Sequence, residues 1–396
     1  MDYSATGFEV QRADGCVFDV GSLYAQLETL ADKRKARGKR YPLALVLVLV
    51  VLAKLAGEDT PYAIAQWARL RQAQLIEALG VSRPWLPSHN TYRRVLGSAV
   101  EVSELEAVVS AFLTSPPGSG RSVLVALDGK TLRGSIPDGH TQGIHLLAAY
   151  LPEEGIVLMQ IAVECRENEI CVAPEVLKSL DLRGKVVMGD ALLTQRRLSA
   201  QIVDAGGDYV WIVKDNQPQL RQDIEQLFQP EVCAPGFSPT PKDFQTAHTV
   251  NKAHGRLEVR TLTSSSLLQD YADWPHLAQV FKLDRQVTLL KTGSQRCQTV
   301  YGITSLAAHQ ADPARLIQIV RDYWGIENGL HYRRDKTLNE DAQRISCPTL
   351  AQATAILNNL VLGLVLKQGY RNLAAARRFY NARLHHALSL LLRAPT

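Results

Sequence analysis

Five short apolar runs between residues 123 and 213 constrain the fold of this chain more than any other feature. The first three follow one another closely, and the last two alternate with segments whose apolar residues recur at helical spacing. Runs of this length bounded by turn residues are typical of buried strands. Strands that first follow one another and then alternate with helices indicate a mixed α/β sheet. The runs are SVLVAL, HLLAAYL, GIVLMQIAVE, KVVMG and DYVWIV.

Helical sequence flanks the predicted sheet, and a second β-rich segment follows it. The stretch 114–122, TSPPGSGRS, has the Pro and Gly content of a linker. Signatures of helix starts occur at Thr60–Pro61, at Ser103 with Glu106, and at Asp312–Pro313. We predict a helical N-terminal region (1–115), the first part of an α/β core (122–229), a β-rich insertion (230–308), a helix that completes the core (309–345) and C-terminal helices (346–396).

Composition and charge limit the classes of protein that fit. The chain has 396 residues, 46% of them hydrophobic, which is enough for more than one core and excludes wholesale disorder. A net charge of +5 allows a nucleic-acid partner without requiring one. Six cysteines without a CxxC pair indicate reduced, buried thiols and neither a disulfide framework nor a zinc site. The apolar run 43–53 is shorter than the roughly 17–25 residues of a membrane span. We therefore predict that it is a fully buried helix, and that the protein is soluble, cytoplasmic and without a membrane partner.

Two of the predicted strands run into an aspartate. Asp128 follows SVLVAL, and Asp190 follows KVVMG just before a helical segment. Taken singly, each is better explained by a turn or by helix capping. Glu327 changes this balance, because it lies in an aromatic-rich helical segment whose face is predicted to pack on the sheet. A carboxylate buried there needs a cation, either Arg334 or His331 beside it, or a divalent metal held together with the two aspartates.

Three such carboxylates are what a two-metal phosphoryl-transfer site requires. Mg²⁺ takes hard oxygen ligands and keeps some of its waters, so a few carboxylates and a substrate phosphate suffice. Two ions about 4 Å apart activate the attacking oxygen and stabilise the leaving one. We therefore predict that Asp128, Asp190 and Glu327 are catalytic residues that bind two Mg²⁺ (or Mn²⁺) ions.

Several separated motifs carry a family resemblance. In their order they resemble the ISAs1 family of bacterial insertion-sequence transposases, relatives of the IS4-type DDE transposases and of the H-repeat-associated proteins. The motifs are LDGKTLRGS (127–135), GDALLTQR (189–196), VKDNQPQL (213–220), WGIENGLHY (324–332) and EDAQR (340–344), with DKRKARGKRYPL and PSHNTYRRVL resembling the family's N-terminal associated region. The resemblance extends over nearly the whole chain. It implies a ribonuclease-H-like core with Asp128 on its first strand, Asp190 just past its fourth, a β-rich insertion, and Glu327 on the helix after it.

The chain departs from the IS4-type pattern around the glutamate. Those enzymes have Tyr and Arg seven and four residues before it and Lys seven residues after it, where this chain has Val320, Tyr323 and Arg334. Arg321 is the nearer basic match. Arg334 keeps the positive charge as a planar fork. From the resemblance we expect DNA contacts from residues of this segment, namely Arg321, Tyr323, Trp324, His331 and Arg334.

Further basic and polar residues are candidates for DNA contacts. For each of them a solvated or structural role is the alternative; for Asn216 alone, capping is the better explanation, and for Arg256 with Arg260 the alternative is a salt-bridged face shared with Glu258. The DKRKARGKR cluster would supply sequence-independent affinity. The candidates are Lys130, Arg133, Lys214, Asn216, Arg256, Arg260, Lys33, Arg34, Arg93 and Arg94.

The function that follows is DNA transposition. The resemblance implies a protein of the bacterial cytoplasm, associated with the nucleoid. It would bind the terminal inverted repeats of its element and target DNA as double strands, as a homodimer or higher oligomer. It would cleave the element's ends and transfer the freed 3′-hydroxyl into the target. Two alternatives stay open: a ribonuclease-H-fold DNA nuclease, and a catalytically silent, DNA-binding H-repeat-like descendant. The insertion argues against the first and the three intact acids against the second.

Overall fold

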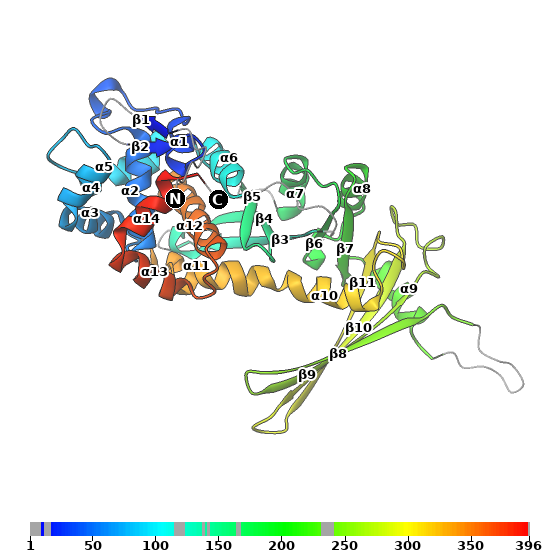
Figure 1. The fold of residues 1–396 in the computed structure, drawn as a ribbon. Helices are drawn as coiled ribbons and strands as arrows, with labels where there is room; N and C mark the ends of the chain where they lie inside the picture. Colours follow the sequence, from blue (N-terminus) through cyan, green and yellow to red (C-terminus); the bar gives the residue numbers. More distant parts are fainter. Residues whose placement is uncertain are drawn as a thin grey trace, which may run out of the picture.

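A nine-stranded mixed sheet runs through the computed structural model, which describes residues 9–11, 17–114, 123–136, 139–140, 143–163, 168–230 and 241–394 (Figure 1). The strand order is β5-β4-β3-β6-β7-β11-β10-β9-β8. The strands are β3 (Val123–Leu132), β4 (Ile144–Leu151), β5 (Ile156–Val163), β6 (Lys185–Gly189), β7 (Asp208–Val213), β8 (Gln245–Ala253), β9 (Arg256–Ser265), β10 (Gln279–Leu289) and β11 (Gln295–Thr304). A separate two-stranded sheet, β1 (Glu9–Gln11) with β2 (Val17–Asp19), lies in the N-terminal region that we predicted to be mostly helical.

All five strands predicted between residues 123 and 213 are confirmed. β3, β6 and β7 are parallel neighbours, and β4 and β5 extend the sheet antiparallel on one side. The β-rich segment forms four further strands on the other side, because β11 pairs antiparallel with β7. It therefore continues the same sheet as a long twisted arm, which Figure 1 shows projecting from the rest of the molecule.

Fourteen helices are described, and several of them cover the two faces of this sheet. One face packs on α7, α8 and α9, and the other on α6, α10 and α12. The helices are α1 (Leu23–Glu28), α2 (Leu43–Leu55), α3 (Pro61–Leu70), α4 (Gln72–Ala78), α5 (His89–Arg94), α6 (Val102–Leu113), α7 (Glu169–Lys178), α8 (Arg196–Asp204), α9 (Pro218–Leu227), α10 (Pro313–Tyr323), α11 (Tyr332–Lys336), α12 (Pro348–Lys367), α13 (Leu373–Ala382) and α14 (Leu384–Leu392).

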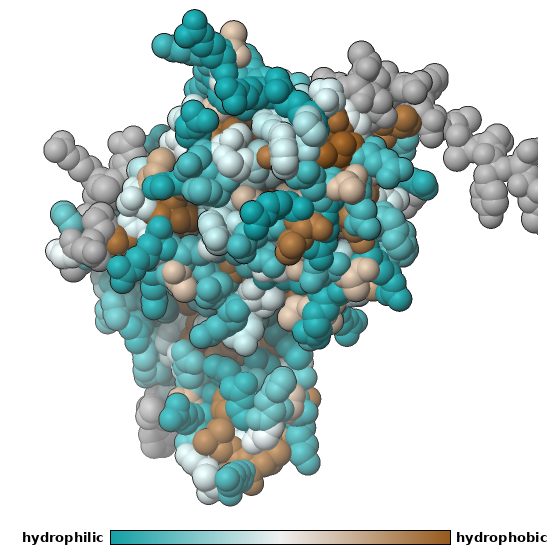
Figure 2. All heavy atoms as spheres, turned by 90° about the vertical axis from the view of Figure 1, so that its left-hand side faces the viewer, coloured by the Kyte–Doolittle hydropathy of each residue, from teal (hydrophilic) through white to brown (hydrophobic). Residues whose placement is uncertain are grey.

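Helices from both ends of the chain share one hydrophobic core. Every residue of α2 is buried, as predicted for the run 43–53, and α12, α13 and α14 pack around it. Helix α12 is long and apolar enough to cross a membrane by length and composition alone, a candidate that our sequence analysis overlooked. However, 83% of its apolar window lies inside the protein, as in a core helix. Figure 2 faces this helical end and shows a mostly hydrophilic surface over it.

Two of the three predicted helix starts are confirmed, and one is wrong. Thr60 and Asp312 each accept a backbone N–H at the start of α3 and α10, with proline as the first helical residue. Helix α6 instead begins at Val102, so Ser103 lies inside its first turn and Glu106 is buried. Burial raises the pKa of Glu106 to about 8. Of the predicted linker 114–122, residues 115–122 lie outside the described part of the chain.

Candidate active site and nucleic-acid interface

The register of two parallel strands places two aspartates side by side. Leu127 of β3 pairs with Gly189 of β6, so Asp128 and Asp190 are the next residue on each strand. We expected β3 to end at Asp128, and this is wrong, because the strand continues to Leu132 in pairing with β4. Asp128 lies where β3 loses its parallel neighbour. Asp190 accepts the N–H of Leu192 and caps a short 3₁₀ turn.

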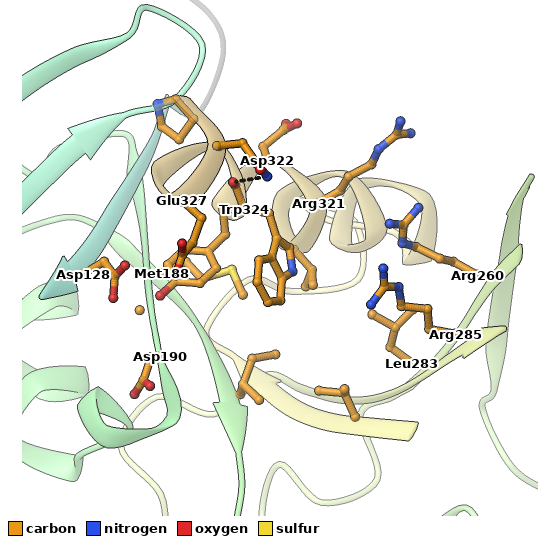
Figure 3. Close-up of a pocket in the computed structure, with 18 of the residues that line it drawn as sticks. Asp128, Met188, Asp190, Arg260, Leu283, Arg285, Arg321, Asp322, Trp324 and Glu327 are labelled. Atoms are coloured by element: carbon orange, nitrogen blue, oxygen red, sulfur yellow. Dashed lines mark hydrogen bonds between the residues drawn. The ribbon is translucent and has the colours of Figure 1, made fainter. Parts of the chain in front are cut away.

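Glu327 lies at the same cavity as the two aspartates, although it comes from a segment much later in the sequence. The predicted continuous helix is interrupted, because α10 ends at Tyr323 and Glu327 lies in a wider, π-helical turn, Ile326–His331, before α11. Such turns are rare in proteins overall, but many of those that occur lie at functional sites. Glu327 lines one cavity of about 840 Å³ together with Asp128 and Asp190 (Figure 3).

The charges around Asp128 are mostly negative. The pKa of Asp128 is raised to about 7, first by burial and then by Glu327, Glu169 and Asp190, while a hydrogen bond from the backbone N–H of Gly129 opposes this rise. His331 places Nδ1 3.8 Å from an Asp128 carboxylate oxygen. Burial, Arg334 and Lys130 lower the pKa of His331 to about 3, so the imidazole is neutral and does not balance the carboxylate.

The donor set fits divalent cations with hard oxygen ligands. Within the described residues no three His, Cys, Asp or Glu side chains lie close enough to form a complete cation site by themselves. Mg²⁺ does not need such a cage, since one or two carboxylates, waters and a substrate phosphate complete its shell. The mutual repulsion of the acids at Asp128 is the condition that a cation relieves.

The cavity has a basic end opposite its acidic end. In Figure 3 the three acids lie on one side and Arg260, Arg285 and Arg321 lie on the other. Trp324 lies between them and is 55% exposed. Arg260 donates to Glu258 over 2.9 Å, and Arg285 also pairs with Glu258. Within the described part of the chain, the buried Nη1 of Arg260 has no hydrogen-bond partner. The cavity-lining arginines Arg256, Arg285 and Arg321 make this end of the cavity basic.

Comparison with known proteins decides the family. The family described as "Transposase DDE domain" matches residues 119–364, more than half of the chain, and the family "DDE_Tnp_1-associated" matches residues 24–113. The chain belongs to the DDE transposase family. It is accordingly a DNA transposase, an enzyme of a family that generally uses divalent metal ions.

Individual relatives have low sequence identity to this chain, but the similarity extends over most of the length of each relative. "Putative transposase YncI" of Escherichia coli O157:H7 is 27% identical over 87% of this transposase and 87% of its own chain. The "Uncharacterized protein in dhlA 3'region" of Xanthobacter autotrophicus is 32% identical over 72% of this chain and 94% of its own. "H repeat-associated putative transposase YhhI" of Escherichia coli K12 is 24% identical over 89% and 94%. A cryo-EM structure of a piggyBac transposase synaptic complex with hairpin DNA matches with a TM-score of 0.44 at 11% identity, over 94% of this chain and 80% of that one.

Four of the predicted DNA contacts in this transposase have side-chain or backbone neighbours within the protein. Lys130 is buried and pairs with Asp335 and Asp341. Arg334 is 1% exposed and donates to Glu340 over 2.8 Å.

Asn216 donates to the carbonyl of Ala191 over 2.6 Å, the structural role that we considered better for it. His331 is buried beside Asp128. Lys130, Arg334 and His331 are buried and Asn216 is exposed, and DNA contacts from these four residues stay predictions.

The remaining predicted contacts in the catalytic half are accessible or line the cavity. Arg133 is exposed, and its Nε lies 3.9 Å from Oδ2 of Asp341. Tyr323 donates a long hydrogen bond of 3.4 Å to the Leu127 carbonyl, beneath the acids. Burial and then the neighbouring carboxylates raise the pKa of Tyr323, so its hydroxyl stays protonated. Lys214, Arg256 and Arg321 line the cavity.

The predicted basic residues of the N-terminal half divide into two groups. Lys33 pairs with Glu101, and Arg34 pairs with Asp32 over 2.7 Å, so part of the DKRKARGKR cluster is neutralised within the fold. Arg93 and Arg94 are exposed in α5 and line a second pocket, against the start of α12.

Three residues near the cavity were missed by the sequence analysis. Arg285 of β10 faces the same way as Arg260, its cross-strand partner in β9. In the sequence, Arg285 shares one strand face with Phe281, Leu283 and Val287, and an arginine on an otherwise apolar face is the signal that could have found it. The other two residues are Glu169 at the start of α7 and His145 of β4, which lie on the opposite face of the sheet from Asp128. In the sequence, Glu169 has only the appearance of an ordinary acid in the first turn of a helix.

Proposed function

We propose that this transposase belongs to the ISAs1 group and cleaves DNA at the ends of an insertion sequence before joining them to target DNA. Asp128, Asp190 and Glu327 would hold two Mg²⁺ (or Mn²⁺) ions. The observation that carries the proposal is their convergence on one cavity from segments far apart in the sequence. The antiparallel β5-β4-β3 strands followed by parallel β6 and β7 support a ribonuclease-H-like core with β8–β11 as its insertion.

The chemistry consists of two in-line phosphoryl transfers. A water oxygen bonds to the scissile phosphorus while the P–O3′ bond breaks, leaving a 3′-hydroxyl on the element and a 5′-phosphate on the flank. That 3′-oxygen then attacks a target phosphorus, and the P–O3′ bond of the target strand breaks. The bound ions would lower the pKa of the attacking hydroxyl and stabilise the charge that develops on the leaving oxygen.

The residues of this chain supply position and charge for both steps. Asp128 and Asp190 are fixed by strand register and Glu327 by the π-helical turn, so the acids are preorganised before DNA binds. The basic end would hold the phosphates that flank the scissile one. Arg256, Arg285 and Arg321, which line the cavity, would donate to phosphate oxygens. Trp324 offers an indole face for stacking on a base or sugar between the two ends.

The arginine cluster itself favours this assignment. Burial lowers the pKa of Arg260, Glu258 opposes this effect, and the neighbouring Arg285 and Arg321 lower the pKa further. Glu258 is the carboxylate that offsets the burial of Arg260 and its repulsion by the two neighbouring guanidinium groups. An anion with several oxygens, such as the DNA backbone, would relieve this repulsion.

The test is cleavage of the element's own ends by Asp128→Asn, Asp190→Asn and Glu327→Gln in Mg²⁺. Each variant should bind a labelled end duplex as the wild type does and lose cleavage. Asp270→Asn, an exposed aspartate in the turn after β9, is the matched control and should cleave normally. Normal cleavage by any of the three site variants would contradict that residue's assignment. Cleavage without joining to target DNA would indicate a nuclease instead.

A further inference from the structure

A fourth carboxylate lies directly behind Asp128. Asp128 faces α10, because its neighbour Leu127 packs in the core on the α7 side and side chains alternate along a strand. Gly129 therefore faces α7, where Glu169 begins the helix. A β-carbon on residue 129 would lie 1.9 Å from Glu169 Oε1, so the carboxylate fills the place of the missing side chain.

Glu169 is held there by a hydrogen-bonded relay. Its Oε1 lies 2.8 Å from His145 Nε2, and His145 Nδ1 lies 2.9 Å from the hydroxyl of Thr131. A carboxylate oxygen accepts hydrogen bonds, so in this pair Nε2–H of His145 is the donor and Oε1 of Glu169 is the acceptor. Thr131 and His145 are cross-strand partners in β3 and β4, which ties the relay to the strand that carries Asp128.

The charge of Glu169 reaches the site. Among the carboxylates that raise the pKa of Asp128, Glu169 ranks after Glu327 and ahead of Asp190. It also contributes to the raised pKa of Tyr323, which lies on the α10 side of the sheet. The charge of Glu169, on the α7 side, therefore acts on two groups of the cavity side.

We propose that Glu169, positioned by His145, is a supporting carboxylate that strengthens divalent-cation binding by acting through Asp128. The inference rests on the proposed function, since it assumes that Asp128 is a metal ligand. Glu169 is a positioning residue in this scheme. A negative charge held near a metal ligand favours the bound cation, as carboxylates behind metal-binding side chains do in other sites.

The test is Mn²⁺ affinity of the full chain, measured by calorimetric titration without DNA at pH 8.5, where Asp128 is ionised. Glu169→Gln keeps the size and the hydrogen-bonding capacity of the side chain and removes only its charge. We expect about fivefold weaker Mn²⁺ binding, the effect of one unit charge in a partly solvated site. Glu175→Gln, an exposed acid on the same helix, is the control and should bind Mn²⁺ like the wild type.

Two further variants separate charge from structure. Glu169→Asp keeps the negative charge, so its Mn²⁺ affinity should be close to that of the wild type. If the role of Glu169 were purely structural, Glu169→Asp would bind Mn²⁺ as weakly as Glu169→Gln. Glu169→Ala, measured if the Gln variant does not fold, should show at least the same loss. Wild-type affinity in Glu169→Gln overturns the inference alone. Wild-type affinity in Asp128→Asn overturns the proposed metal site as well.

Discussion

Replacing Asp128 by Asn should stabilise the metal-free transposase while abolishing its activity. The pKa of Asp128 is raised from 3.8 to about 7, first by burial and then by Glu327. The folded state therefore binds a proton more tightly than the unfolded chain, and the free energy of unfolding falls as the pH rises from about 4 to about 7. The pKa difference corresponds to about 4 kcal/mol at pH 8, an upper limit that asparagine removes.

The assay is thermal unfolding in EDTA at pH 4 and pH 8. For a chain of this length, ~4 kcal/mol corresponds to a rise in melting temperature of about 5 °C. Asp128→Asn should melt higher than the wild type at pH 8 and like the wild type at pH 4, while Asp270→Asn should match the wild type at both. Added Mg²⁺ should raise the wild-type melting temperature more than that of the variant. An equal shift at both pH values, or none, would refute this account of Asp128.

Three further outcomes are expected. Arg256→Ala and Arg321→Ala, measured separately, should each reduce the slope of log affinity against log salt by about 0.9 for end-duplex binding, the effect of one lost phosphate contact; unchanged slopes would place the DNA elsewhere. Arg334→Met should lower the free energy of unfolding by about 3 kcal/mol in a urea titration, because the buried Glu340 loses its cationic partner and keeps only the hydrogen bond from Asn358. A change in DNA binding without loss of stability would support Arg334 as a DNA contact. Gly129→Ala should displace the Glu169 carboxylate and weaken Mn²⁺ binding with DNA binding kept, and wild-type Mn²⁺ affinity would show that the carboxylate relocates without cost.

The sequence predicts the strands of this fold because each is an apolar run with clear ends. All five runs between residues 123 and 213 form strands, and the aspartates follow from them, since one register brings Leu127 beside Gly189. That the β-rich segment continues the same sheet could not be predicted. The pairing of β11 with β7 depends on contacts between strands about 90 residues apart, which local patterns do not report.

Side-chain roles were harder to predict than elements. Arg334 looks like an exposed cation on a catalytic helix, yet Gln160 and Asn359, from distant segments, form a buried polar site for it. Ser103 and Glu106 have the spacing of a capping box, but packing of α6 buries Glu106 instead. Glu169 gives no signal beyond an acid in the first turn of a helix, which is common for reasons unrelated to function.

The most direct test of the central claim is the position of Mn²⁺ in crystals of the full chain with a duplex of the element's end. Anomalous scattering locates the ions independently of the protein model. We expect two peaks about 4 Å apart, bounded by carboxylate oxygens of Asp128, Asp190 and Glu327. Ordered Mn²⁺ elsewhere, with Glu327 turned away from the two aspartates, would contradict the account.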